Sequence, residues 1–346
     1  MLNLVLEVDI KDFSLEQMAG QRLMVGFEGT ELNRDLEFLI DTIKVGGIVL
    51  FARNLENPEQ IRHLCDSIHE YARSSGQPPL FIAIDQEGGQ VARLRKPFTQ
   101  FPGNSKMKDI KDAKYFARVT AKELKGVGIN MNLAPVMDVA PEGINSVMAE
   151  RSFGCDTIRV SELGATVIGN LQKRNIMSVA KHFPGIGRTT LDSHLDMPNL
   201  DIDINEMAST DLVPFEAAIS KDVAGIMLSH IRYKKIDPEW PASLSVSIAK
   251  DLLRRHMNFG GVVMTDDLDM GAIRKHYDIQ SVIRQMVTAD IDIALICHKG
   301  PDIEKAFEEI LNILDDSGLL KAKGEASVNR IMGLKRKYLG IEGLRD

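Results

Sequence analysis

Cysteine is scarce in this sequence, and its scarcity narrows the classes of protein to consider. Three cysteines occur in 346 residues, Cys65, Cys155 and Cys297, and no two of them form a CxxC pair. A disulfide framework or a zinc knuckle needs cysteines in close, repeated spacing. The sequence therefore predicts neither of these structures.

Long apolar runs and a surplus of positive charge are also missing. No stretch reaches the ~18 uninterrupted apolar residues of a membrane-spanning helix, and residues 1–13 lack the basic start and apolar run of a secretory signal. The formal net charge is −7, with the basic residues scattered along the sequence, which argues against nucleic acid or a membrane as the main partner. We therefore expect a cytoplasmic protein, with a monomer favoured.

What the sequence does contain is a series of short apolar runs separated by helical patterns. Continuous rather than alternating hydrophobicity is typical of parallel strands that are covered on both faces. Eight such runs occur, at residues 23–27, 46–51, 80–84, 129–136, 176–180, 225–229, 261–265 and 291–297. Eight strands alternating with helices predict an α/β fold, a single (β/α)8 TIM-type barrel. A doubly wound open sheet is the alternative, but no GxGxxG follows the first run.

The helical patterns begin with N-capping residues. Nothing along the sequence marks a boundary between two domains. A capping box occupies residues 14–17, and Asn57 stands at the N-cap position of the helix that follows the second run. No Ser/Gly linker or change in composition divides the chain. We expect one catalytic domain over residues 1–346, with the barrel at about 20–317 and a charged C-terminal helix at about 318–346 packed on its outside.

Polar or ionisable residues stand directly after most of the later runs. In a TIM barrel the C-terminal ends of the strands meet at one rim, where the active site lies. One charged residue at such a position would only mark a solvated loop, whereas many on the same rim predict a site. The residues at this rim are Asp85, Asp138, Lys181, His182, His230, Asp266 and Asp267.

Two kinds of chemistry can be assigned to the basic members of this set. Lys181 on a barrel strand could form a Schiff base with a carbonyl substrate. His182, His194 and His230, with an aspartate, could instead bind a metal ion, although no HxH pair follows the first run. Residue spacing alone leaves both readings open.

A third kind of chemistry uses the acids. Asp266 could act as nucleophile or stabiliser in glycoside hydrolysis, with the Asp192–His194 pair as acid/base. A carboxylate two residues from a histidine can turn back onto one ring nitrogen and fix the tautomer, which leaves the other nitrogen for proton transfer. This reading is also open on spacing alone.

A family resemblance separates these readings. The segment KHFPGIGRTTLDSH, residues 181–194, resembles the KHFPGHG…DSH signature of the family 3 glycoside hydrolases, specifically the bacterial β-N-acetylglucosaminidases of peptidoglycan recycling. Supporting stretches, among them IAIDQEGGQVARL, RSFG and VVMTDDLDMGAI, run in order between residues 23 and 300. The resemblance implies a retaining exo-β-N-acetylglucosaminidase that removes terminal β-linked N-acetylglucosamine from muropeptides, with neither a metal nor an organic cofactor.

The same resemblance implies a role for eight residues. It places the nucleophile at Asp266 and the acid/base at His194, with Asp192 as the partner of His194. The reaction it implies has two steps and passes through a covalent glycosyl-aspartate. The sugar-binding residues it implies are Asp85, Arg93, Arg151, Lys181 and His182.

One position departs from the family signature, and other activities stay open. Ile186 stands where the signature has a histidine, which removes any contact that histidine would make but leaves Asp266 and His194 intact. A β-glycoside phosphorylase, or a broader β-glucosidase or β-xylosidase, is an alternative on the same fold. An alternative of another class is a non-catalytic sugar-binding barrel, against which the intact Asp266 and His194 argue.

Overall fold

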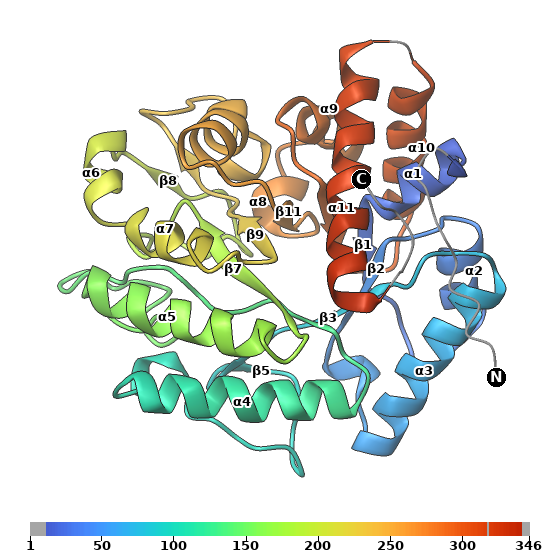
Figure 1. The fold of residues 1–346 in the computed structure, drawn as a ribbon. Coiled ribbons are helices and arrows are strands. Elements are labelled where there is room, and N and C mark those ends of the chain that lie inside the picture. The colour runs from blue at the N-terminus through green and yellow to red at the C-terminus, as the bar shows by residue number, and fades with distance from the viewer. Residues whose placement is uncertain (1–11, 317, 341–346) are drawn as a thin grey trace.

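The computed structural model describes residues 12–316 and 318–340. Its centre is a closed barrel of eight parallel strands in the order β1-β12-β11-β9-β7-β6-β3-β2 (Figure 1). Each strand overlaps one of the eight apolar runs, so the predicted (β/α)8 barrel is confirmed. The strands are β1 Leu23–Val25, β2 Gly47–Leu50, β3 Phe81–Ile84, β6 Met131–Asn132, β7 Met177–Phe183, β9 Gly225–Leu228, β11 Val262–Asp267 and β12 Ile293–Ile296.

Alternate residues of each strand face the inside of the barrel and the surrounding helices. Met24, Phe81 and Ala83 belong to the cluster that fills the barrel. Their neighbours Val25 and Ile82 belong to the larger cluster between strands and helices. Because both faces of every strand are covered, the strands are apolar at successive positions, which is the pattern seen in the sequence.

Helices surround the barrel and begin at the predicted caps (Figure 1). Ser14 Oγ accepts a hydrogen bond from the Gln17 backbone N at 3.2 Å, and Gln17 Oε1 accepts one from the Ser14 N at 3.1 Å, which confirms the capping box. The Asn57 side chain caps α3, also as predicted. The main helices are α1 Leu15–Gln21, α2 Arg34–Asp41, α3 Pro58–Ser74, α4 Ile110–Gly126, α5 Thr157–Gln172, α6 Ile204–Ser209, α7 Val213–Ile219, η5 Val246–His256, α8 Gly271–Arg274, α9 Ile279–Thr288, α10 Asp302–Asp315 and α11 Leu319–Leu339.

Two pairs of short strands lie at the C-terminal end of the barrel. The first is an antiparallel pair, β4 Gln86–Gly88 and β5 Val91–Ala92, directly after β3. The second is a parallel pair, β8 Asn199–Leu200 and β10 Arg232–Tyr233, which joins the connections that follow β7 and β9. Both pairs hold loops that border the site described below.

The last helix, α11, does more than cover the outside of the barrel. Ile331 and Leu334 belong to the cluster inside the barrel, and Lys335 Nζ lies 4.9 Å from the centre of the Phe81 ring and donates to Gln21 Oε1 at 2.6 Å. The helix therefore closes the N-terminal mouth of the barrel, an arrangement that the prediction of an outer helix did not include. Residues 341–346 of the predicted helix, and residues 1–11, lie outside the described residues.

Across residues 12–316 and 318–340, none of the helices combines the length and the apolar character that crossing a bilayer requires.

Candidate active site

A pocket of about 400 Å³ opens at the C-terminal ends of the barrel strands. Strands β7 and β11 and the loops that follow β3, β6 and β7 contribute to its lining, so residues far apart in the sequence meet there. All eight residues singled out by the family resemblance line this pocket: Asp85, Arg93, Arg151, Lys181, His182, Asp192, His194 and Asp266.

Lys181 is the centre of a buried network of charges in this pocket. Its Nζ lies 2.7 Å from Asp85 Oδ1 and 2.7 Å from Glu87 Oε1. Burial alone would lower the pKa of Lys181, but the two carboxylates outweigh it, and the pKa is raised. A lysine that is held protonated is a poor nucleophile, which argues against the Schiff-base reading.

Glu87 is a member of this network that the sequence analysis missed. Its carboxylate accepts two parallel hydrogen bonds from Arg151, at 3.0 Å from Nε and 2.8 Å from Nη2. This bidentate geometry orients the guanidinium as well as neutralising it. The signal for Glu87 was its position two residues after Asp85, because alternate side chains of an extended segment share one side.

Asp85 keeps its charge because cations surround it. Arg93 Nη2 lies 3.2 Å from Asp85 Oδ2, opposite the contact with Lys181. Burial alone would raise the pKa of Asp85, but Lys181 and Arg93 outweigh it and lower the pKa to about 2. Asp85 is therefore an acceptor of hydrogen bonds only, as a ligand for sugar hydroxyls requires. Two acids and three cations leave this side of the pocket positive.

A third acid, Asp138, holds two residues of the pocket wall in place. It follows β6 and accepts hydrogen bonds from the Ile186 backbone N at 2.8 Å and from His182 Nδ1 at 2.8 Å. The His182 ring thus carries its proton on Nδ1, and its Nε2 faces Arg151 Nη2 at 3.5 Å. The sequence placed Asp138 on the rim without a role. Ile186, the departure from the signature, is one of the residues that line the pocket.

His230 does not line the pocket but supports the strand that carries Asp266. Its Nε2 lies 2.8 Å from the Asp267 carbonyl oxygen and its Nδ1 lies 2.7 Å from Ser243 Oγ. A carbonyl only accepts, so Nε2 carries the proton. Burial lowers the pKa of His230 and keeps the ring neutral. His182 and His230 are both hydrogen-bonded to other protein groups. The three histidines of the metal-binding hypothesis are therefore not available together as ligands of one metal ion.

The Asp192–His194 pair lies on the long loop between β7 and β8. Asp192 Oδ1 is 2.7 Å from His194 Nδ1 and accepts the His194 backbone N at 2.9 Å. Burial alone would raise the pKa of Asp192, but these two hydrogen bonds outweigh it and lower the pKa. The carboxylate therefore stays ionised beside the imidazole, whose Nε2 is left free.

This loop is docked on the segment that follows β11. The backbone N atoms of Gly271 and Ala272 donate to the carbonyl oxygens of His194 and Ser193, at 3.3 and 3.1 Å. Lys275 Nζ also donates to the Leu195 carbonyl oxygen at 2.6 Å. Because β11 carries Asp266, these contacts hold the Asp192–His194 pair on the same side of the pocket as that carboxylate.

Asp267, next to Asp266, has an unusual environment. Its Oδ1 accepts hydrogen bonds from the backbone N atoms of Asp269 and Cys297, at 3.0 and 3.1 Å. Burial raises the pKa of Asp267 from 3.8 to about 6. Asp267, Asp269 and His298 offer ligand atoms within 4.8 Å of one another, so a divalent cation could fit there. The carboxylates are already used by backbone N–H groups, and we assign no metal to them.

Comparison with known proteins gives one family. Residues 12–334 match the family model described as the glycosyl hydrolase family 3 N-terminal domain. The chain is 34% identical to β-hexosaminidase A of Pseudoalteromonas piscicida over 93% of its own length and 61% of that protein. It is 32% identical to the β-hexosaminidase of Nitrosomonas eutropha, over 90% of its own length and 91% of that protein.

Solved structures give the same result. A family 3 β-N-acetylglucosaminidase from a Paenibacillus species superposes with a TM-score of 0.91 at 33% identity, covering 96% of this chain and 64% of that one. A β-N-acetylhexosaminidase from Beutenbergia cavernae superposes with a TM-score of 0.87 at 28% identity, covering 94% and 99%. The chain thus spans less than two thirds of some relatives and nearly all of others.

The fold and its pocket place the chain among the (β/α)8 barrels of the glycosyl hydrolases. Within that class, the chain belongs to glycosyl hydrolase family 3.

We predict that Asp267→Asn stabilises the protein at pH 7.5 but not at pH 4. Between pH 3.8 and about 6 the folded state keeps a proton on Asp267 that the unfolded state has lost, so the free energy of unfolding falls as pH rises through this window. Above it, the buried charge costs about 3 kcal/mol, and an uncharged Asn removes that cost while its Oδ1 still accepts both backbone N–H groups.

Urea unfolding of the wild type and Asp267→Asn at both pH values measures this difference. Asp201→Asn, at an exposed carboxylate, is the control and should change neither value. An equal effect of Asp267→Asn at the two pH values would show that Asp267 titrates normally.

Proposed function

We propose that the protein is an exo-β-N-acetylglucosaminidase that removes terminal β-linked N-acetylglucosamine with retention of configuration. The observation that carries this proposal is the hydrogen-bonded Asp192–His194 pair on a loop docked beside β11, in the same pocket as Asp266. The β-hexosaminidase and β-N-acetylglucosaminidase relatives support the choice of sugar.

In the first step, Asp266 attacks the anomeric carbon and forms a covalent glycosyl ester. The bond from that carbon to the leaving oxygen breaks, and protonated His194 gives its Nε2 proton to the departing oxygen. Ionised Asp192 stabilises the imidazolium before this transfer and keeps Nε2 toward the substrate, because it occupies Nδ1.

In the second step, the neutral His194 takes a proton from water, and the oxygen of that water attacks the anomeric carbon. The ester bond to Asp266 breaks, the sugar leaves in its original β configuration, and His194 is protonated again. The same residue therefore serves first as acid and then as base.

The charged network around Lys181 forms the sugar-binding side in this proposal. Ionised Asp85 accepts hydrogen bonds from sugar hydroxyls, while Arg93 and the remaining donor of Lys181 supply N–H groups. Arg151, held by Glu87, orients His182. Donors and acceptors that are already fixed by one another lose little freedom when the sugar binds.

We further propose peptidoglycan fragments as substrates, in the cytoplasm, with the barrel and α11 as one catalytic domain. The match of the family model to residues 12–334, which includes most of α11, supports the single domain. Three cysteines that are all free suit a reducing compartment.

Asp266→Ala should lower kcat on a chromogenic β-N-acetylglucosaminide by at least about 1,000-fold, or ~4 kcal/mol in the barrier. Thermal unfolding should stay close to wild type, because a carboxylate at the mouth of a barrel contributes little packing. Asp201→Ala, which removes an exposed carboxylate elsewhere, is the matched control. A variant of Asp266 that keeps more than about a tenth of kcat, a loss under ~1.4 kcal/mol, would rule out its role as nucleophile.

His194→Ala should damage turnover of substrates with poor leaving groups most. A phenolate of low basicity departs without a proton, whereas a sugar alcohol needs one. We expect kcat/KM to fall by about 100-fold or more on a disaccharide and several-fold less on a nitrophenyl glycoside. Asp192→Asn should show the same pattern in milder form. Equal losses on both substrates would mean that His194 only positions the sugar.

Gly271→Ala tests whether the docking of the loop matters for catalysis. A Cβ at this position would lie 2.6 Å from the His194 carbonyl oxygen and 2.8 Å from that of Leu195, so the loop must move away. We expect the pattern of His194→Ala, a larger loss on the disaccharide than on the nitrophenyl glycoside, although every pocket side chain is kept. Gly333→Ala, where a Cβ meets nothing within 4 Å, is the control. Unchanged kinetics in Gly271→Ala would contradict a need for the docked loop.

A further inference from the structure

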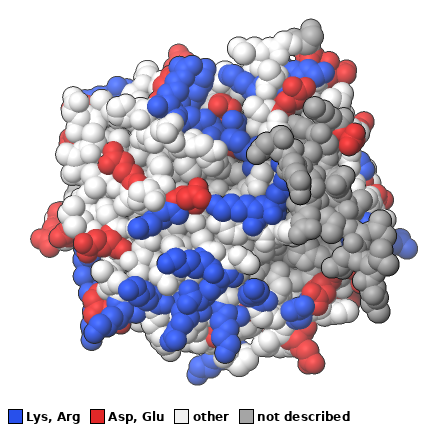
Figure 2. All heavy atoms as spheres, viewed as in Figure 1, with Lys and Arg blue, Asp and Glu red and all other residues white. Residues whose placement is uncertain are grey.

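The outer face of α4 carries a row of cations that the catalytic site does not use. Lys111, Lys114, Arg118, Lys122 and Lys125 follow one another at intervals of three or four residues and are all exposed. At 3.6 residues per turn this spacing puts them on one face of the helix, over a length of about 21 Å. Figure 2 shows Lys and Arg gathered over the region where Figure 1 places α4.

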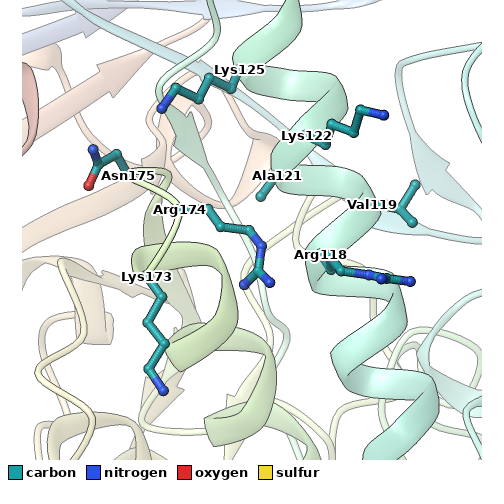
Figure 3. Close-up of a pocket in the computed structure, with 8 residues that line it drawn as sticks. All are labelled: Arg118, Val119, Ala121, Lys122, Lys125, Lys173, Arg174 and Asn175. Atoms are coloured by element: carbon teal, nitrogen blue, oxygen red, sulfur yellow. The ribbon is translucent and has the colours of Figure 1, made fainter.

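Two more cations extend this face where the chain turns from α5 to β7. Lys173 and Arg174 lie across a hollow of about 640 Å³ from the C-terminal half of α4. Figure 3 shows the Arg174 and Lys125 side chains extending across the space between the two segments, while the side chains of Arg118 and Lys122 extend from α4 away from that space. We call the set Arg118, Lys122, Lys125, Lys173 and Arg174 the basic groove.

No acid neutralises the basic groove. Among residues 12–316 and 318–340, none of its five cations forms an ion pair, and its lining contains no Asp or Glu. The one acid in the C-terminal half of α4, Glu123, is turned to Thr99 and accepts its hydroxyl at 2.7 Å. The whole chain has a net charge of −7, so an unpaired basic surface is not a consequence of overall composition. The fold brings together cations from two segments of the chain, residues 118–125 of α4 and residues 173–174.

We propose that the basic groove is a docking surface for an acidic segment of a partner protein. The α4 cation row, Lys111 to Lys125, continues the groove along the helix, and its length of about 21 Å matches an acidic helix of about 14 residues or an extended segment of about six. Unpaired charge of one sign steers a partner of the other sign. The groove lies near the N-terminal ends of the strands, away from the pocket. A partner can therefore hold the enzyme without covering its active site. This inference does not rest on the proposed activity.

The shape of the groove favours a protein segment over a bilayer or a nucleic acid. A flat bilayer would span the hollow, whereas an acidic side chain can enter it and meet Arg174. Single-stranded nucleic acid binds through several bases stacked in succession, whereas α4 carries a single exposed ring among the described residues. This ring, Tyr115, packs edge-on against Phe101 and has the Arg118 guanidinium over its face.

Fluorescence anisotropy with a labelled decaglutamate peptide tests the docking surface. The wild type should bind the peptide, more weakly as salt rises, because exposed charges are screened. Arg118→Ala/Lys122→Ala/Lys125→Ala should weaken binding at least tenfold. The matched control is Lys234→Ala/Arg255→Ala/Lys305→Ala, which also removes one Arg and two Lys and should bind as the wild type does. Both triple variants should keep wild-type melting temperatures and glycosidase activity.

Three outcomes would overturn the proposal. The first is no binding of the peptide by the wild type, and the second is an equal loss in the two triple variants. The third is tighter binding, through the same three residues, to phosphatidylglycerol vesicles or to a single-stranded oligonucleotide than to the peptide, which would assign the groove to a membrane or to nucleic acid instead.

Discussion

The buried ion pairs of Lys181 are the interaction on which the mouth of the barrel depends. A buried ammonium group is costly unless it is paired, and the loss of one partner leaves an uncompensated charge. Lys181 on β7 finds its partners, Asp85 and Glu87, on the segment after β3, and Glu87 in turn holds Arg151 from the loop after β6. One network therefore fixes a strand and two connections relative to one another, and it sets the positions of the proposed sugar-binding groups.

The other side of the pocket is built on a different principle. The Asp192–His194 pair is largely exposed, with side-chain exposures of 51% and 67%, and its position comes from hydrogen bonds between the loop and the segment after β11. A pair that must exchange protons with substrate and water needs access to solvent, whereas groups that bind the sugar gain from burial. The site thus combines the buried charged network around Lys181 with an exposed loop that backbone hydrogen bonds to the segment after β11 hold in place.

The barrel could be predicted from the sequence because all eight strands are covered on both faces and so appear as continuous apolar runs. Those residues of the candidate site that belong to a recognisable motif could also be predicted. Glu87 and Asp138 escaped a role because their partners, Arg151, Lys181 and His182, are 44 or more residues away in the chain, and spacing shows no such contact. The closure of the barrel by α11 could not be predicted for the same reason. It depends on which turn of the helix contacts Phe81, and the sequence does not show that long-range contact.

Both steps of the proposed reaction depend on a covalent bond between the sugar and Asp266. The most direct measurement is peptide mass spectrometry after incubation with a fluorinated N-acetylglucosaminyl fluoride, a substrate whose second step is slow. We expect the mass of one glycosyl unit on the peptide that contains Asp266, and we expect this mass to be absent from the Asp266→Ala protein. A label on any other residue, or none while the probe is turned over, would contradict it.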